Sequence, residues 1–140
     1  MNDRYLADPL QQLTHAYKSY MRRAIQDAGI GIPITHVRAL KGIASRNECT
    51  ALALATRMRR DKAQITRVLN DLLAAGLIVK HDNPADRRSH LLELSTAGQA
   101  LMTQIRTFEA AAAERMTSGL SANQVEAFIH VANHMTEQLK

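Results

Sequence analysis

The sequence is poor in several kinds of residue, and each shortage excludes a class of protein. It contains no Trp, three Tyr and two Phe among 140 residues. Proteins that bind single-stranded nucleic acids stack bases on aromatic side chains, so this composition argues against that class. The single cysteine, Cys49, cannot form an internal disulfide, which favours a reducing, cytoplasmic compartment. No stretch approaches the roughly 18 consecutive apolar residues of a membrane-spanning helix, and the polar start of the chain predicts no signal peptide.

Catalytic and cofactor motifs are also missing from the sequence. There is no His-Glu-x-x-His zinc motif, no Gly-x-Ser-x-Gly nucleophile turn and no recognisable pair of catalytic carboxylates. Gly29 and Gly31 lack the third glycine and the preceding strand of a dinucleotide loop. We therefore expect no catalytic residues, no enzyme activity and no cofactor.

What the chain has in excess is positive charge. Its formal net charge is +5 and its sequence pI is about 9.8. Residues 57–94 hold 8 basic and 5 acidic side chains, whereas residues 95–140 hold 3 basic and 4 acidic ones. A small basic protein suits a polyanionic partner, and the middle of the chain is the part expected to face it.

Apolar periodicity predicts a long helix at each end of the chain. Asp8-Pro9 is typical of a helix start, and Gly29 to Pro33 should end that first helix. The expected apolar seam at the two ends comprises Leu10, Leu13, Tyr17, Tyr20, Val125, Ile129 and Met135. Steps of three and four residues suit either a helix pair within one chain or a dimer interface. Ser121 to Gln124 has the pattern of a capping box, and the last helix should bury the apolar face that follows it.

The middle of the chain predicts three short helices and a hairpin. The helices are expected at about 35–44, 50–58 and 62–75, and strands at 77–80 and 89–94 flank a turn at 82–86. A further helix should run from Ser95 or Thr96 to Met116. This order is the winged-helix layout, in which residues 50–75 form a helix-turn-helix with Ala55 at the helix crossing and Ile65 seating the second helix on the core.

The second helix of that motif has a polar outer face. If Ile65 points inward, the side chains directed outward or flanking that direction are Lys62, Ala63, Gln64, Thr66, Arg67 and Asn70. Arg, Asn and Gln can hydrogen-bond base edges in the major groove of DNA, and Thr can contact a phosphate or a thymine methyl group. A solvated polar face is the plain alternative, but the nearby cations Arg57, Arg59 and Arg60 favour DNA.

The hairpin tip carries Asp86, Arg87 and Arg88. A hairpin arm with two arginines can place one guanidinium in the minor groove, where narrow A·T tracts concentrate negative potential. A carboxylate is the wrong sign beside DNA unless it orients an arginine, so we expect Asp86 to hold Arg88 through an ion pair.

These motifs together resemble the MarR family of bacterial transcription regulators. The resemblance extends over about residues 34–100 and is most specific in Asp82-Asn83-Pro84-Ala85-Asp86-Arg87-Arg88 and in Leu94-Ser95-Thr96-Ala97-Gly98. Two positions depart from the family pattern: Arg60 stands where a small aliphatic residue is usual, and His36 stands where Gln is common.

The resemblance implies a mainly α (α+β winged-helix) fold of six helices with a two-stranded wing, dimerising through the N- and C-terminal helices. Residues 34–94 would form the DNA-binding lobe, and residues 1–33 and 95–140 the dimerisation lobe. It further implies a homodimer that binds a pseudo-palindromic operator on double-stranded DNA as a repressor. A small-molecule effector, of a kind the sequence does not specify, would bind between the lobes.

Two alternatives remain open from the residues alone. The winged helix could bind a protein partner without specific DNA binding, or the regulator could sense redox state or a metal. Cys49 is the redox candidate, but it is better explained as a small buried apolar residue. His130 and His134, spaced four apart near Glu126 and Glu137, are the metal candidates, but such a face is usually only solvated, so we expect no metal.

Overall fold

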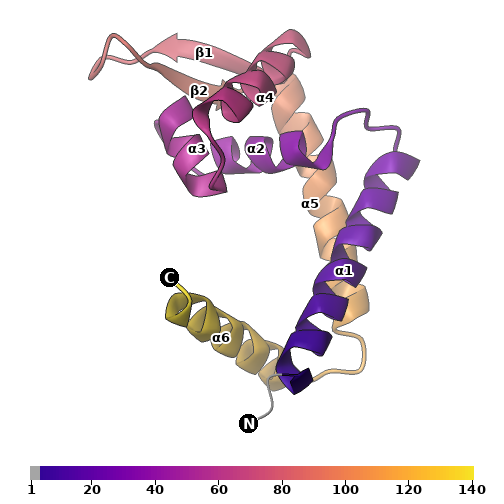
Figure 1. The fold of residues 1–140 in the computed structure, drawn as a ribbon. Coiled ribbons are helices and arrows are strands. Elements are labelled where there is room, and N and C mark those ends of the chain that lie inside the picture. The colour runs from indigo at the N-terminus through magenta and orange to yellow at the C-terminus, as the bar shows by residue number, and fades with distance from the viewer. Residues whose placement is uncertain (1–3) are drawn as a thin grey trace. The chain divides into compact units, whose positions relative to one another are not determined.

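The computed structural model describes residues 4–140, which hold six helices and one two-stranded antiparallel sheet (Figure 1). The order is α1 (Arg4–Asp27), α2 (Ile34–Ala44), α3 (Ala51–Met58), α4 (Lys62–Ala74), β1 (Ile78–Asp82), β2 (His90–Leu94), α5 (Thr96–Met116) and α6 (Ala122–Gln138). The expected mainly α, winged-helix class is confirmed. None of the helices in this range is long and apolar enough to cross a membrane.

The described chain forms two units. One comprises residues 22–107 and holds α2, α3, α4 and the hairpin. The other comprises residues 4–21 and 108–140, and therefore holds most of α1, the end of α5 and the whole of α6. Both boundaries fall inside helices, in α1 and in α5.

The first unit, residues 22–107, has a continuous apolar core. Its most deeply buried large side chains are Leu40, Leu54, Ile65, Leu72, Met102 and Ile105. Gly42 allows α2 to approach α3, because a Cβ atom there would lie 2.7 Å from Cδ1 of Leu54. This close packing fixes α3, and with it α4, on the core.

Most helix ends follow the expected local signals, but the start of α1 does not. Gly29, with a φ of +73°, follows the end of α1 as expected. The predicted start at Asp8-Pro9 is wrong, because α1 begins at Arg4 and Pro9 lies inside the helix. Pro9 is the sixth residue of α1, so it removes the one N–H group that would bond to the Tyr5 carbonyl, and the helix continues on both sides of it.

The hairpin pairs Ile78 with Leu94 at one end and Asp82 with His90 at the other. The strands begin one residue later than predicted, and β1 extends two residues further. Ile78 and Leu92 are buried and attach the hairpin to the core. The N–H of Leu92 also donates to the carbonyl of Cys49 at 2.8 Å, which joins β2 to the segment before α3.

The second unit, residues 4–21 and 108–140, buries much less apolar surface. Ser121 and Gln124 form both bonds of the predicted capping box, at 3.1 and 2.8 Å, so α6 begins as expected. Arg115 of α5 lies over the ring of Tyr20 at 5.9 Å. The prediction that α6 buries its apolar face is wrong within a single chain, because none of its residues is buried. Its apolar residues have too few neighbours in this unit to be covered.

Candidate nucleic-acid interface

Local chemistry sets the turn between α3 and α4. Thr50 caps α3 by accepting the N–H of Ala53 at 3.1 Å, and Asp61 caps α4 by accepting the N–H of Gln64 at 2.8 Å. Between the two helices, Arg59 adopts the left-handed conformation, with φ 52° and ψ 45°. The turn is therefore only three residues long, which is the geometry of a helix-turn-helix.

The outer face of α4 is polar and exposed. All the residues predicted for it are exposed, namely Lys62, Ala63, Gln64, Thr66, Arg67 and Asn70. The opposite face is buried through Ile65, Val68, Leu69 and Leu72. The Thr66 hydroxyl donates to the carbonyl of Lys62 at 2.8 Å, which leaves its methyl group and its oxygen lone pairs for a partner. Such a face offers the donors and acceptors that recognise base edges in the major groove.

The turn adds cations beside this face. Arg59 and Arg60 are exposed, and Arg57 lies exposed in the last turn of α3. None of the three has an ion pair with another described residue. Their guanidinium groups are therefore available to bind phosphate.

The hairpin tip is ordered by its own side chains. The Asn83 amide donates to the Ser89 hydroxyl at 2.9 Å, and its oxygen accepts the N–H of Ala85 at 3.0 Å. Asp86 Oδ1 accepts the backbone N–H of Arg88 at 2.9 Å, whereas the Nε of Arg88 lies 3.6 Å from the same oxygen. The expected carboxylate–guanidinium contact is thus present, but the shorter bond is the one to the backbone. The side chain of Arg88 is 94% exposed and projects into solvent.

The junction between β2 and α5 explains the Leu-Ser-Thr-Ala-Gly motif physically. The Ser95 hydroxyl donates to the carbonyl of Gly76 at 2.6 Å and accepts the N–H of Gly98 at 3.0 Å. The fold requires glycine at position 98, because a Cβ atom there would overlap the carbonyl oxygen of Leu77. This close contact fixes the base of the hairpin, and so its direction, relative to α4.

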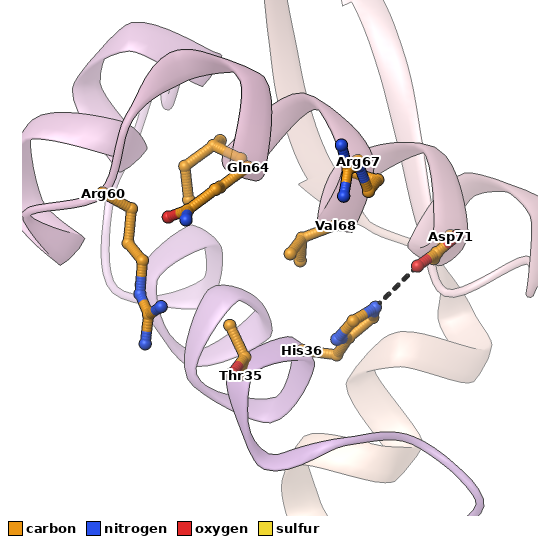
Figure 2. Close-up of a pocket in the computed structure, with 8 residues that line it drawn as sticks. Thr35, His36, Arg60, Gln64, Arg67, Val68 and Asp71 are labelled. Atoms are coloured by element: carbon orange, nitrogen blue, oxygen red, sulfur yellow. Dashed lines mark hydrogen bonds and ion pairs between the residues drawn. The ribbon is translucent and has the colours of Figure 1, made fainter.

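A pocket of about 160 Å³ lies between the start of α2 and α4 (Figure 2). It is lined by Thr35, His36, Arg60, Gln64, Ile65, Arg67, Val68 and Asp71. His36 Nε2 lies 2.9 Å from Asp71 Oδ2, and the other ring nitrogen, Nδ1, is buried without a partner among the described residues. Sequence reasoning missed the roles of Thr35, His36 and Asp71 here. No local pattern could connect His36 and Asp71, because they are 35 residues apart.

Cys49 lies in the core of the same unit. It is fully buried, and this burial raises the pKa of its thiol, although the nearby Arg46 and Arg57 act in the opposite direction. A thiol held in its neutral form is a poor nucleophile. These properties fit the predicted role as a small apolar core residue.

The apolar seam predicted for the ends of the chain lies in the second unit, and much of it is exposed. Leu10 is 59% exposed, Leu13 37%, Ile129 52% and Met135 41%. Tyr17, Tyr20 and Val125 are partly exposed. Exposed apolar residues at helical spacing on α1 and α6 are typical of an interface with another chain.

The polar face of α6 carries the suggested metal residues. His130, His134, Glu126 and Glu137 are all exposed. Among residues 4–140, no three His, Cys, Asp or Glu side chains lie close enough together to hold a metal ion.

The sequence matches the model of a protein family and a curated relative. The model of the MarR family matches residues 30–89. A protein of Thauera aromatica, named as the proposed transcriptional regulatory protein for the hcr operon, is 36% identical over 79 residues. That alignment covers 51% of this chain and 48% of the relative, so it spans about half the length of the curated protein it matches.

Solved structures resemble this fold over almost its whole length. A MarR transcriptional regulator from Methanosarcina mazei Go1 superposes with a TM-score of 0.81 at 18% identity, covering 96% of both chains. A cysteine mutant of MarR from E. coli, complexed with operator DNA, superposes with a TM-score of 0.70 at 23% identity. That match covers 92% of this chain and 94% of the other.

Proposed function

Because this chain belongs to the MarR family, we propose that it is a sequence-specific regulator of transcription that binds double-stranded DNA. The observation that carries the proposal is the exposed face of α4, flanked by Arg59 and Arg60 in the turn and by Arg88 on the wing. The helix would enter the major groove, where Gln64 and Asn70 can contact base edges. The bidentate geometry of Asn or Gln with adenine would supply sequence specificity, and the Arg67 guanidinium would contact the DNA backbone.

The wing would add a second kind of contact. Arg88 would enter the minor groove beside the recognition site, and Arg87 would neutralise phosphate. In this arrangement Asp86 favours binding despite its charge, because its bond to the backbone of Arg88 shapes the turn that presents the arginine. We place this DNA-binding lobe at residues 34–94.

We also propose that the regulator is a homodimer. The lobe formed by residues 1–33 and 95–140, of which residues 1–3 lie outside the described part, would supply the interface. The exposed apolar side chains of α1 and α6 support this, since two copies could cover one another's Leu10 and Ile129. A two-fold dimer would present its two α4 helices about one DNA turn, roughly 34 Å, apart on a pseudo-palindromic operator.

Release by a small-molecule effector, and action as a repressor, are proposed from the family membership alone. The lone Cys49, which has no second thiol to pair with, supports a cytoplasmic location.

Fluorescence anisotropy with a labelled mixed-sequence duplex tests DNA binding directly. If about 6–10 phosphates are neutralised per dimer, affinity should fall by about 10³–10⁵ between about 50 and 200 mM salt. A winged helix that only binds a protein partner would show no binding even at low salt. Selection of genomic fragments followed by footprinting would then identify the operator and the genes beside it.

A further inference from the structure

The pocket between α2 and α4 is lined in part by side chains that can donate hydrogen bonds to an oxyanion. Figure 2 shows Arg60 and Gln64 at one end, His36 and Asp71 at the other, and Arg67 and Val68 between them. The guanidinium groups of Arg60 and Arg67 have no ion-pair partner among the described residues. The donors therefore come from three parts of the fold: the α3–α4 turn, α4 itself and the first turn of α2.

The start of α2 strengthens this character. Its N-cap is Pro33, which provides no side-chain cap, so the N-terminal N–H groups of the helix receive no such bond. Thr35, in that first turn, lines the pocket and adds a hydroxyl donor. Helix N-termini attract anions through these N–H groups and the helix dipole, and here two arginine side chains face the same space.

Asp71 is the only carboxylate among the residues that line the pocket. Its Oδ2 is hydrogen-bonded to Nε2 of His36. Asp71 lies one helical turn after Arg67, a spacing at which Asp and Arg pair on a helix surface. With its Oδ2 held 2.9 Å from His36 Nε2, the carboxylate is drawn towards α2. This bond is also the only one that the His36 ring makes, because Nδ1 has no partner in the described structure. The two side chains therefore fix each other, and Arg67 stays available.

We propose that this pocket receives a phosphate of the DNA backbone, held by Arg60, Arg67 and Thr35. In this proposal His36 is a positioning residue that keeps Asp71 from competing for Arg67. The inference rests on the proposed function, since it assigns a contact within the DNA complex.

The contribution of the His36–Asp71 pair to folding stability should be small. The Asp71 side chain is 63% exposed, and ion pairs with an exposed partner contribute little. Variants of the pair should therefore fold, and circular dichroism and thermal unfolding would verify this. Differences in DNA affinity can then be attributed to the pocket.

The test measures anisotropy with a mixed-sequence duplex of about 30 base pairs, long enough for two half-sites one turn apart. Arg60→Ala should weaken binding to this duplex by about tenfold or more, as expected for a lost charge-assisted contact. It should also reduce the slope of log affinity against log salt by about one per pocket. Arg106→Ala, which removes an exposed cation of α5 outside the interface, is the matched control and should change neither value.

His36 is tested by rescue. His36→Ala should weaken binding several-fold, because the freed Asp71 can pair with Arg67. The double variant His36→Ala with Asp71→Asn should restore the affinity, since the competing charge is then gone. His36→Gln, which keeps a donor for Asp71, should stay close to wild type. If the double variant binds as weakly as His36→Ala, the ring has a merely structural role and the positioning proposal is wrong.

The outcomes separate the pocket from the proposed function. If the wild-type chain binds no duplex at any salt concentration, DNA binding itself fails. If it binds, and Arg88→Ala weakens binding while the pocket variants change neither affinity nor slope, only the pocket proposal fails. Inorganic phosphate distinguishes the source of the anion at matched ionic strength. Saturable phosphate binding that Arg60→Ala abolishes, without any loss of duplex affinity, would assign the pocket to a free anion and overturn the proposal.

Discussion

The Asp86 carboxylate lies closer to the backbone of Arg88 than to its guanidinium: Asp86 Oδ1 is 2.9 Å from the Arg88 backbone nitrogen and 3.6 Å from Nε of the Arg88 side chain. This bond is an Asx turn, in which a side-chain oxygen replaces a backbone acceptor two residues before the donor. The carboxylate therefore acts first on the shape of the wing tip. Its effect on the direction of the arginine follows from that shape.

The wing can be tested by comparing three variants in anisotropy titrations on the operator. Arg88→Ala should cost about 1–3 kcal/mol of binding free energy, with a larger loss when the flanks are rich in A·T. Asp86→Ala should also weaken binding, although it removes a negative charge. Asp86→Asn should retain most of the affinity, because the amide oxygen can still accept the N–H of Arg88. Tighter binding by Asp86→Ala at fixed salt would exclude an orienting role for Asp86.

The backbone conformation of Arg59 should lower the folding stability, whereas its side chain should raise the affinity for DNA. Arg59 is one of two non-glycine residues with positive φ in the described chain, the other being Glu48. A left-handed residue with a side chain is strained by about 1 kcal/mol, so Arg59→Gly should raise the unfolding free energy by up to about that amount. The same variant should weaken DNA binding through the lost cation.

Glu48→Gly is the matched control for Arg59→Gly. It relieves the same backbone conformation outside the helix-turn-helix turn, at φ 58°. Urea unfolding should show similar stabilisation for both variants, whereas only Arg59→Gly should lose affinity. Undiminished DNA binding by Arg59→Gly would show that the turn does not contact DNA.

Gly98→Ala should destabilise the fold. A methyl group at this position would overlap the Leu77 carbonyl oxygen, and the backbone must move to admit it. We expect a loss of about 1–3 kcal/mol in urea unfolding, the usual range for overpacking. Gly31→Ala is the control, because nothing lies within 4 Å of its Cβ position and its φ is not positive. That change should be neutral or stabilising by about 0.4–1 kcal/mol. Equal effects of the two substitutions would contradict the packing described at the hairpin base.

The dimer can be disrupted from α6. Ile129→Glu places a charge on the exposed apolar face, and we expect a 15.5 kDa monomer in sedimentation equilibrium at micromolar concentration. DNA affinity should fall with it, because the two recognition helices would no longer be linked. His130→Glu introduces the same charge on the polar face of the helix and should leave the dimer intact. A wild-type chain that sediments only as a monomer would refute the dimer.

The Cys49 thiol should be unreactive, and its burial should make its contribution to folding stability depend on pH. Its folded pKa is raised above the ordinary 9.0 by desolvation, so the buried neutral thiol stabilises the fold below that pH. As the pH rises above about 9, the unfolded thiol ionises first and this contribution declines. The stability advantage of wild type over Cys49→Ala should therefore shrink between about pH 8 and pH 10 in urea unfolding. DNA release by peroxide, present in wild type and absent from Cys49→Ser, would instead establish a redox switch.

Features fixed by short-range chemistry were predictable from the sequence. Thr50, Asp61 and Ser121 each cap a helix through a bond to a residue three positions later, so their patterns are complete within four residues. The left-handed glycines after α1 and α4 belong to the same category. The outer face of α4 was also predictable, because a helix with an inward Ile65 has only one direction left for its polar residues.

Features that depend on distant residues were not predictable. The His36–Asp71 bond joins two helices, and neither residue has a neighbour in sequence that marks it. The exposure of α6 has a different cause. Periodicity identifies an apolar face but says nothing about whether the surface that covers it belongs to the same chain. The start of α1 was wrong because Asp8-Pro9 is a strong local signal, while the helix continues upstream through Tyr5 and Leu6.

The bond from the Leu92 N–H to the Cys49 carbonyl also constrains the spacing between two parts of the proposed DNA-binding surface. It ties the wing to the segment that leads into the helix-turn-helix, so Arg88 and α4 cannot slide independently along the duplex. The interval between a minor-groove contact and a major-groove contact is then set by the protein. One extra base pair between the two contacts lengthens that interval by about 3.4 Å and rotates one contact away from the other. A half-site with the right bases but the wrong spacing would therefore lose either the major-groove contact or the minor-groove contact.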